Sequence, residues 1–341
     1  MAVTLREIAS ALGVSISTVS LVLNDKESGR VNSELAARVR HTAADLGYQP
    51  NLLAKGLKTR RTHTIGVISD NVASVPFASP LLSGAQEAAR AAGYFLLITE
   101  IGGHPELESE AIAALVQRDV DALIVAADYH RLRQVPQLQA GVPTVLLDCG
   151  PISGQVAHVL PDEVGGAMAG TQHLVEMGHS DIGYIGIDDP RYLARELRRK
   201  GFEDALTAAG LEPNSSWMVN GADPTTTSGR QAARQLLGQS STPSAVFCFS
   251  DQMAMGLLQI AQSMGLRVPE DLSIVGFDNQ HYVANATLPA LTTVELPLIQ
   301  IGRLAVEMAL EQVDAPGEPV EADGHLVSCP LVVRDSTLPR Q

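Results

Sequence analysis

The apolar positions in the first fifty residues follow the spacing of short helices. Between Thr4 and Asn24 they recur every three or four positions and predict two helices, with inner faces formed by Leu5, Ile8, Ala9, Leu12, Val19, Val22 and Leu23. A third helix is expected to begin at Asn32 or Ser33 and to end at Gly47, with an inner face formed by Leu35, Val39 and Leu46. This part of the chain is therefore expected to be a small all-α module.

The joint between the first two helices carries local signals for a tight turn. Thr4 and Glu7 fit a capping box, in which each side chain accepts a backbone N–H of the other residue. Gly13 can take the left-handed conformation that ends the first helix, and Ser15 can cap the second. Two short helices joined by a glycine turn have the geometry that lays the second helix in the major groove of DNA. The alternative is a pair of ordinary helices in a larger all-α core.

From Thr64 onward the pattern changes to short continuous apolar runs that alternate with helical segments. The runs lie at 64–68, 95–98, 122–125, 145–147, 182–185, 245–249 and 272–275. Such runs between helices are typical of parallel sheets covered on both faces. The pattern occurs twice and breaks near 160–162, so it predicts two doubly wound α/β lobes. Ligands of such lobes bind at the carboxyl ends of the strands, here in the cleft between the lobes.

The charge of the chain is divided unevenly between these two parts. Residues 1–61 hold nine Lys and Arg against five Asp and Glu, whereas the remainder holds fifteen basic and thirty-three acidic residues. A basic segment followed by an acidic one suggests a nucleic-acid module attached to a domain with another task, because phosphates attract the first and are repelled by the second. An acidic surface kept for solubility would explain the second part but not the first.

The composition also predicts the cellular compartment of the protein. No apolar run approaches the length of a membrane span, and the first residues do not have the pattern of a signal peptide. Cys149, Cys248 and Cys329 are far apart and lack a metal-binding spacing, so we expect buried free thiols in a reducing cytoplasm.

Thr18-Val19-Ser20 and Asn24 in the second helix, and Leu46-Gly47-Tyr48-Gln49-Pro50-Asn51 after the third, closely resemble the headpiece of the LacI/GalR (lactose/galactose repressor) family of bacterial transcription factors. The resemblance continues through the rest of the chain. It implies binding of double-stranded operator DNA through Thr4, Ser15, Ile16, Ser17, Thr18, Ser20, Leu21, Asn24, Asn51, Ala54, Lys55 and Leu57. The family often has arginine where Leu21 stands, so a bidentate contact to guanine is missing here.

A hinge helix is expected after the headpiece. Pro50 suits its first turn, and the segment from Asn51 to Leu57 is too short to hold a helix alone in water, particularly with Gly56 inside it. We therefore expect it to fold only on DNA. The resemblance implies that two hinge helices of a dimer pair in the minor groove, where Leu57 opens the central base step. The alternative is a plain linker.

The resemblance also implies the periplasmic sugar-binding-protein fold for the rest of the chain, with three chain crossings between the lobes. On that basis residues 1–48 form the helix-turn-helix headpiece, 49–62 the hinge helix and linker, and 63–336 the effector-binding domain. The first lobe is expected to take about 62–160 plus 291–322. The second is expected to take about 161–290 plus 323–336.

Two residues are expected to dominate the effector site. Arg198 in Arg198-Arg199-Lys200-Gly201-Phe202 and Asp278 in Gly276-Phe277-Asp278-Asn279 match family positions that contact the effector. Together they could grip vicinal hydroxyls or the polar edge of a purine, although a structural ion pair is the alternative. The full expected set is Phe77, Asp148, Tyr192, Arg198, Ser250 and Asp278. Pro224 and Leu296 replace an aromatic and a polar residue common in the family, which leaves the identity of the ligand open.

Enzyme activity has little support in the sequence. It lacks HExxH, GxSxG, GxGxxG and a Walker lysine, no metal or cofactor is expected, and His104, His130 and His281 are expected on the surface. A solute-binding protein sharing the lobes would need a signal peptide and no headpiece, and a sugar or nucleoside enzyme would need a catalytic constellation. We therefore predict a cytoplasmic, homodimeric transcription regulator, a repressor of carbohydrate-utilisation genes. Its operator is pseudo-palindromic, and its effector is a sugar or sugar derivative rather than a purine.

Overall fold

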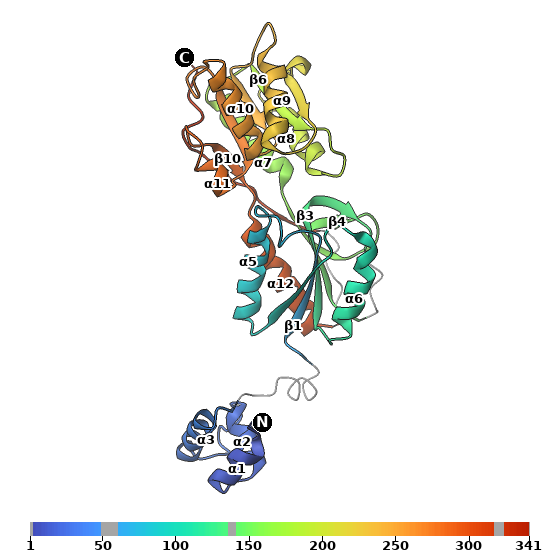
Figure 1. Cartoon of the computed structure of the whole chain (residues 1–341), viewed down its shortest axis with the longest axis vertical. Helices are drawn as coiled ribbons and strands as arrows, with labels where there is room; N and C mark the ends of the chain where they lie inside the picture. The colour runs from blue at the N-terminus through green and yellow to red at the C-terminus, as the bar shows by residue number, and fades with distance from the viewer. Residues whose placement is uncertain (1–2, 49–60, 136–140, 317–323, 341) are drawn as a thin grey trace. The chain divides into compact units, whose positions relative to one another are not determined.

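The computed structural model describes residues 3–48, 61–135, 141–316 and 324–340. The chain divides into two compact units, Met1–Thr62 and His63–Gln341. The described part of the first unit folds into helices, and the second unit contains two sheets with helices on both faces (Figure 1). This confirms the expected fold class of a small all-α module followed by an α/β domain of two lobes.

The first unit is made of α1 (Leu5–Leu12), α2 (Ile16–Leu23) and α3 (Ser33–Asp45). Tyr48 packs against its buried core, which consists of Ile8, Ala9, Val19, Val22, Ala36, Val39 and Ala43. The expected burial of Leu46 is wrong. The helix ends at Asp45, and Leu46 lies at the C-cap with 43% of its surface exposed. The last turn of α3 packs on the core through Ala43 instead.

The first lobe is built on a six-stranded parallel sheet with the order β11-β5-β4-β3-β1-β2. Its strands are β1 (Thr64–Ser69), β2 (Phe95–Glu100), β3 (Ala122–Arg133), β4 (Thr144–Pro151), β5 (Ala157–Pro161) and β11 (His325–Val327). Helices α5 (Ser79–Ala91) and α12 (Leu298–Asp314) cover one face, and α6 (Glu108–Val116), preceded by η1 (Pro105–Leu107), covers the other. Successive strand residues such as Val67 and Ile68 therefore enter different cores.

The second lobe repeats this plan with the strand order β12-β10-β9-β8-β6-β7. Its strands are β6 (Ile182–Ile187), β7 (Met218–Gly221), β8 (Ala245–Cys248), β9 (Ser273–Asp278), β10 (Thr292–Glu295) and β12 (Leu331–Val332), of which β12 is antiparallel to β10. Helices α9 (Thr226–Leu237) and α10 (Asp251–Ser263) pack on one face, and α7 (Glu163–Glu176) and α8 (Ala194–Ala208) pack on the other. The short elements η2 (Ser215–Trp217) and α11 (His281–Ala284) complete the lobe.

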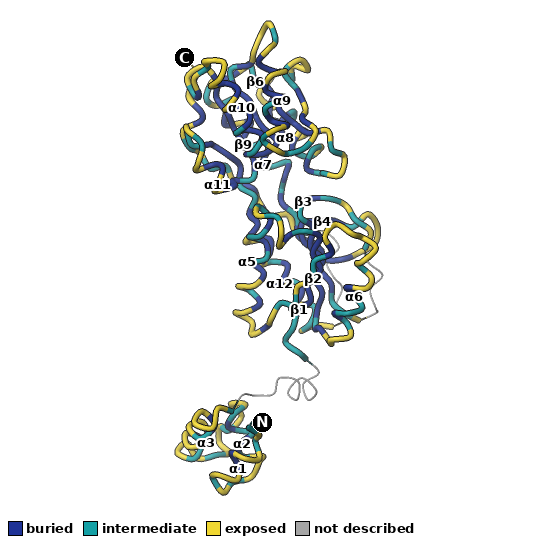
Figure 2. The backbone as a smooth tube through the Cα atoms, viewed as in Figure 1, coloured by how far each residue is buried: buried dark blue, intermediate teal, exposed yellow. Residues whose placement is uncertain are grey.

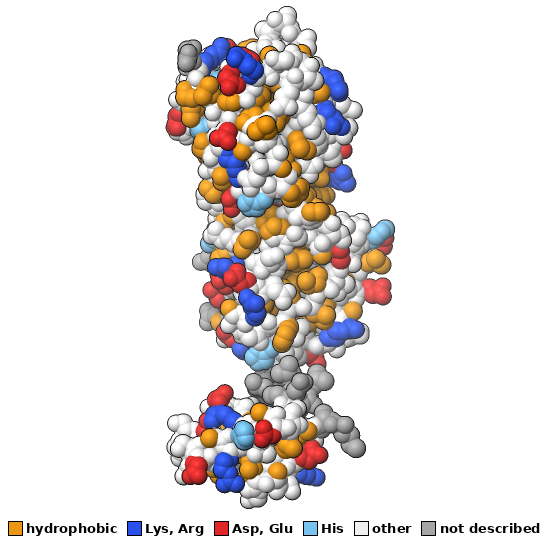
Figure 3. Space-filling view, turned by 60° about the vertical axis from the view of Figure 1, so that its left-hand side comes forward, with side chains coloured by type: hydrophobic (Ala, Val, Ile, Leu, Met, Phe, Trp, Pro, Cys, Tyr) orange, Lys and Arg blue, Asp and Glu red, His pale blue; other side chains and the backbone are white. Residues whose placement is uncertain are grey.

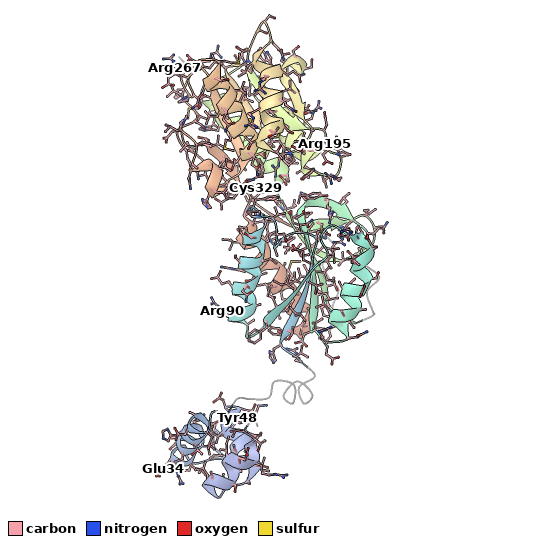
Figure 4. All side chains as sticks on the ribbon, in the orientation of Figure 1. Glu34, Tyr48, Arg90, Arg195, Arg267 and Cys329 are labelled. Carbon is pink, nitrogen blue, oxygen red and sulfur yellow. The ribbon has the colours of Figure 1, made fainter. Side chains whose placement is uncertain are left out.

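The chain crosses between the lobes three times, after β5, after β10 and between β11 and β12. Cys329 lies on the third crossing, where the lobes meet (Figure 4). Two expected lobe boundaries need correction. Strand β10, at 292–295, pairs with β9 and belongs to the second sheet, whereas β11, at 325–327, pairs with β5 and belongs to the first. The pattern along the chain predicts strands but does not reveal which neighbour each strand selects.

Helices α5 and α12 approach each other so closely that their backbones touch. A Cβ atom on Gly84 would lie 1.9 Å from the carbonyl oxygen of Ile299, and one on Gly302 would lie 2.0 Å from the carbonyl oxygen of Leu81. Both distances are far below van der Waals contact, so each helix presents a glycine where the other helix crosses it. This contact fixes α12, the helix that follows the second crossing, on the first lobe.

The strands of both sheets are mostly buried, and exposed residues concentrate on helices and loops (Figure 2). The three cysteines are buried free thiols, as expected. Among the described residues, no single helix has the length and apolarity needed to cross a membrane, and α1 and α2 meet those criteria only as a pair bent by 112°.

Candidate functional site

The first candidate site is the surface of α2, whose position is fixed by local hydrogen bonds. The Thr4 hydroxyl accepts the Glu7 N–H, and the Glu7 carboxylate accepts the Thr4 N–H at 2.7 Å, which completes the predicted capping box. Gly13 ends α1 with a φ of 65°. Ser15 Oγ accepts the Thr18 N–H at 3.0 Å and caps α2. Thr4 and Ser15, both expected at the DNA, therefore have structural roles as well.

The outward face of α2 presents small polar and apolar side chains. Val19 and Val22 are buried on the inner face, whereas Ser17 and Ile16 are exposed at the amino-terminal end of the helix. Five of the expected DNA-binding residues share this outward face, namely Ile16, Ser17, Ser20, Leu21 and Asn24. Hydroxyls, an amide and two aliphatic side chains can meet base edges, thymine methyl groups and phosphates.

Ion pairs hold the loop that follows α2. Arg40 of α3 forms ion pairs with Asp25 at 3.1 Å and with Glu27, and these pairs tie the loop after α2 to the third helix. Lys26 and Arg30 of the same loop are exposed, so they can meet phosphates. The remaining expected DNA contacts, Asn51, Ala54, Lys55 and Leu57, lie outside the described residues together with the predicted hinge helix.

The second candidate site is a cleft at the carboxyl ends of the strands of both lobes. Strand β3 shifts register against β4 between Ala126 and Arg131, so residues 127–130 form a bulge. Opposite the bulge, Asp148 of β4 has a φ of 55°, which is rare for a residue other than glycine. The bulge and this turn bring Asp128, Tyr129 and His130 around one cavity with Asp148.

Arg198 of α8 is the central cation of the cleft and is almost completely buried. Its Nε and Nη2 donate to the two carboxylate oxygens of Glu163 at 2.7 and 3.3 Å. Its Nη1 donates to the Phe249 carbonyl and to Asp278 Oδ1, the latter at 3.1 Å. The guanidinium carbon lies 3.7 Å from the ring centroid of Phe277. Arg198 and Asp278 thus form the ion pair that the sequence left open as the alternative to ligand contact, and Glu163 is the main partner of the arginine.

Aromatic side chains close the cleft from both lobes. Tyr129 of the first lobe stacks on Tyr192 of the second, with ring centroids 4.2 Å apart and an interplanar angle of 30°. Phe249 meets Tyr192 edge-on at 6.3 Å, and Phe77 lines the cavity from the first lobe. The backbone N–H of Leu193 also donates to the carbonyl oxygen of His130 across the lobes. The two lobes therefore touch at the cleft in this structure.

The structure brings together five of the six expected effector residues, because Phe77, Asp148, Tyr192, Arg198 and Asp278 all line the cavity. Ser250 does not line it. Its Oγ caps α10 by accepting the Met253 N–H and donates to the Pro224 carbonyl. Pro224 and Leu296, the two departures from the family pattern, lie in the cavity wall, so they shape the space that a ligand would occupy.

Three acidic or basic residues of the cleft were not expected from the sequence. Asp128, His130 and Glu163 line the cavity, and the expected surface position of His130 is wrong because only 5% of this residue is exposed. His104 and His281 are exposed, as expected. Asp128, Tyr129 and His130 lie within β3, directly after its buried residues 122–127. The end of that apolar run was the available signal, although it does not show the bulge that turns these residues to the cleft.

Burial and neighbouring charges shift the pKa values of the cleft carboxyls in different directions. Burial raises the pKa of Asp148 to about 7. It also raises that of Asp278 to about 6, against the opposing effect of Arg198. Burial disfavours ionisation of Glu163 too, but Arg198 and His130 outweigh it and lower that pKa to about 2. Glu163 is therefore the permanently charged partner of Arg198, and Asp148 is the carboxyl that titrates near neutral pH.

The cavity between these residues is small, about 60 Å³. Pockets that hold small-molecule ligands usually measure roughly 300 Å³ or more, so a sugar-sized molecule can enter only when the lobes move apart. A larger cavity of about 640 Å³ lies beside it, with walls that include Pro76, Pro80, Tyr282, Ile299 and Arg303. Buried acceptors converge on the smaller cavity, where Asp128 and Asp148 each hold an oxygen without a hydrogen-bond partner in the described chain. The cleft is therefore the better ligand site.

The described side chains do not form a metal site. In the ranges that the structure describes, no group of three or more His, Cys, Asp or Glu side chains could hold a metal ion. The carboxylates of the cleft face Arg198 and aromatic rings instead, which suits recognition by hydrogen bonds.

Comparison with known proteins shows relatives that cover both parts of the chain. Residues 4–51 match the family model described as bacterial regulatory proteins, lacI family, and residues 171–337 match that of a periplasmic binding protein-like domain. The chain is 34% identical over 322 residues to the HTH-type transcriptional repressor PurR of Erwinia tasmaniensis, covering 92% of each chain. It is 32% identical to the ribose operon repressor of Haemophilus influenzae, covering 92% of this chain and 93% of the relative.

Solved structures agree with these relatives. A complex of the transcriptional regulator CelR with cellobiose is 30% identical, with a TM-score of 0.68 over 98% of this chain and 99% of that chain. The lac repressor dimer bound to operator and the anti-inducer ONPF is 26% identical, with a TM-score of 0.80 over 99% of this chain and 100% of that chain. The helix-turn-helix unit and the two-lobed cleft are thus the two parts of a ligand-responsive DNA-binding transcriptional repressor, and the chain belongs to the LacI family of bacterial regulatory proteins.

Proposed function

We propose that this repressor senses a sugar or sugar derivative and controls carbohydrate-utilisation genes. The observation that carries the proposal is Asp148 Oδ1, a buried carboxylate oxygen that faces the cleft without a hydrogen-bond partner in the described chain. Asp278 faces the same cavity from the other lobe, and Tyr192 and Phe77 supply aromatic surface. Carboxylates that accept hydrogen bonds from hydroxyl groups, placed beside aromatic rings, suit the binding of a sugar. The related CelR structure is a complex with cellobiose.

The working form in this proposal is a homodimer on a pseudo-palindromic operator. One three-helix unit offers a single α2 to the major groove, so two copies are needed to read two half-sites. Large apolar side chains are exposed on the second unit, including Phe95 and Ile98 on the edge strand β2 and Ile299 on α12. The visible face of this unit carries apolar side chains between charged ones (Figure 3). A second copy that covered such residues would gain burial of apolar surface.

The effector acts in this proposal by changing the balance between open and closed lobes. Arg198 and Asp278 belong to the second lobe, and Asp148 and Phe77 belong to the first, so a ligand that bonds to both lobes favours one spacing between them. That change then alters the tendency of the hinge segments to fold on DNA.

Selection of binding sites from random DNA, followed by gel shifts with candidate sugars, tests the proposal. The full chain should select a palindrome, and a sugar that stabilises the protein thermally should change its affinity for that site. Asp278→Asn should abolish the response and leave ligand-free operator affinity unchanged, whereas Asp271→Asn, at an exposed Arg267 pair, should behave as wild type. Absence of a selected sequence, or an unchanged response in Asp278→Asn, would contradict the proposal.

A further inference from the structure

Glu163, the first residue of α7, is a buried carboxylate in the wall of the cleft. Its N-terminal neighbour Asp162 caps the helix through the Gly165 N–H at 2.8 Å, which fixes the backbone at this point. Only 2% of Glu163 is exposed, and its side chain lines the cleft. His130 Nδ1 of the first lobe lies 3.6 Å from Glu163 Oε1, so the carboxylate faces both the arginine of its own lobe and a histidine of the other.

Glu163 occupies the face of Arg198 that an anionic ligand would need. A guanidinium binds a carboxylate or phosphate best through two parallel N–H groups, and here Nε and Nη2 already direct such a pair at the two oxygens of Glu163. Nη1 is directed at the Phe249 carbonyl and at Asp278. Four of the five N–H groups of the guanidinium therefore have acceptors among the described residues.

The other titratable side chains that face the cavity are mostly carboxyls, of which Glu163 stays ionised, whereas Asp148, with a pKa of about 7, is partly protonated near neutral pH. Asp128, Asp148, Glu163 and Asp278 line it together with one arginine, Arg198, and one histidine, His130. Two arginines near the cavity have carboxylate partners of their own, since Arg131 of β3 is paired with Asp70 and Arg191 is paired with Asp189. A phosphate or carboxylate placed in the cleft would meet these acids at close range in a site that excludes water, where repulsion is strong.

The cleft is at the same time rich in acceptors that have no donor. Asp128 and Asp148 each hold one buried oxygen without a partner in the described chain. Buried acceptors of this kind are satisfied when a ligand brings hydroxyl or ammonium hydrogens to them. The ligand must therefore carry several donors, and a positive charge would be favourable.

Resting on the sugar-sensing function proposed above, we propose that Glu163 sets the charge of the ligand. Because it neutralises Arg198 and adds to the acidic wall, the cleft accepts uncharged sugars and amino sugars and rejects sugar phosphates and sugar acids. Loss of its charge frees Arg198 to bind an anion. Glu163 is in this role a specificity-determining residue.

Matched ligand series test the proposal by calorimetric titration of the full chain. Each series contains a neutral sugar, its amino derivative, its phosphate and its acid, for example glucose, glucosamine, glucose 6-phosphate and gluconate, with equivalent series for galactose and ribose. Wild type should bind a neutral or aminated member at least about tenfold more tightly than the anionic members of that series. Glu163→Gln should reduce this ratio by about tenfold and should gain affinity for inorganic phosphate.

Two further variants separate the charge from other effects. Glu163→Gln combined with Arg198→Gln removes both charges of the buried pair, so it should lose the gained phosphate affinity. Glu176→Gln is the same change on the exposed part of α7 and should keep the wild-type ratios. If Glu163→Gln does not fold, the affinities of the wild-type protein for the neutral, aminated and anionic members of each series still test the inference.

Three results would overturn the inference. These are tighter binding of any phosphate or acid than of its neutral parent by wild type, no binding of any neutral or aminated probe, and an unchanged ratio in Glu163→Gln. Operator binding is measured in parallel. A wild-type protein that binds its operator but prefers anions overturns this inference alone, whereas one without operator binding contradicts the proposed function.

Discussion

Asp148 combines burial, an unusual backbone conformation and an unsatisfied oxygen at one position. Its carboxyl pKa is raised to about 7 in the folded protein, against 3.8 for an exposed aspartate. Between these two values the folded state binds more protons than the unfolded state, so stability falls as the pH rises through this window. Asp148→Asn mimics the protonated carboxyl and should stabilise the ligand-free protein by an amount that grows by about 2–3 kcal/mol between pH 5 and pH 8.

Chemical denaturation of both proteins at several pH values measures this difference. Asp271→Asn is the control, because the hydrogen bonds from Arg267 lower the pKa of Asp271 to about 2 and leave no titration of that group in the same range. A difference between Asp148→Asn and wild type that is constant from pH 5 to pH 8 would show that Asp148 does not carry the raised pKa.

Leu21 is the residue of α2 where the sequence departs from the arginine common in the family. It shares the outward face of the helix with Ser17, one turn earlier. Leu21→Arg should add a preference for guanine at one position in each half-site, worth about 1–3 kcal/mol, because a guanidinium can bond to O6 and N7 together. Sites selected by wild type should instead show a well-defined centre. Unchanged half-sites in Leu21→Arg would mean that this side chain does not reach a base.

At the scale of elements, the contact between α5 and α12 gives a sharp prediction. Gly84→Ala places a methyl group against the carbonyl oxygen of Ile299, and backbone atoms cannot move aside as a flexible side chain can. The free energy of unfolding of the second unit should fall by about 2 kcal/mol or more. Ser83→Ala, on the exposed side of the same helix, should have little effect. Equal stability of the two variants in urea would show that the helices separate easily at this point.

Elements defined by local chemistry could be predicted from the sequence, and those defined by distant contacts could not. The caps at Thr4 and Ser15 follow from side chains within three residues of their partners. Burial of Leu46 was wrong because helical spacing does not tell where the last turn leaves the core. His130 and Glu163 enter the cleft through a bulge in β3 and through the contact between lobes, neither of which has a signature in the apolar pattern.

At the scale of the whole second unit, the stack of Tyr129 on Tyr192 reports whether the lobes meet without ligand. Aromatic pairs of this kind contribute about 0.5–1.5 kcal/mol beyond their burial. A double-mutant cycle with Tyr129→Leu and Tyr192→Leu should therefore give a coupling energy in that range for the ligand-free protein. Thermal or urea unfolding measures the four free energies. A coupling energy near zero would show that the lobes stand apart until a ligand arrives.

The assignment of segments to lobes is a property of the whole fold. The resemblance to the LacI family implied three crossings, and three are present, but Thr292–Glu295 and His325–Val327 each belong to the lobe opposite to the expected one. A strand of three or four residues carries too little sequence to specify its neighbour. Its place is decided by the sheet edge that is open when the rest of the lobe has formed.

The three crossings also impose an order on biosynthesis. The helix-turn-helix unit is complete once its first sixty-two residues have emerged from the ribosome, and it has a core of its own. Neither lobe can be complete at that stage. The first lobe also needs α12 and β11 and the second needs β10 and β12, and all of these elements lie after residue 291. Domains made of one contiguous segment fold as they emerge. A chain cut short by a premature stop codon between residues 63 and 291 would therefore yield a folded DNA-binding unit with no completed effector-binding domain attached.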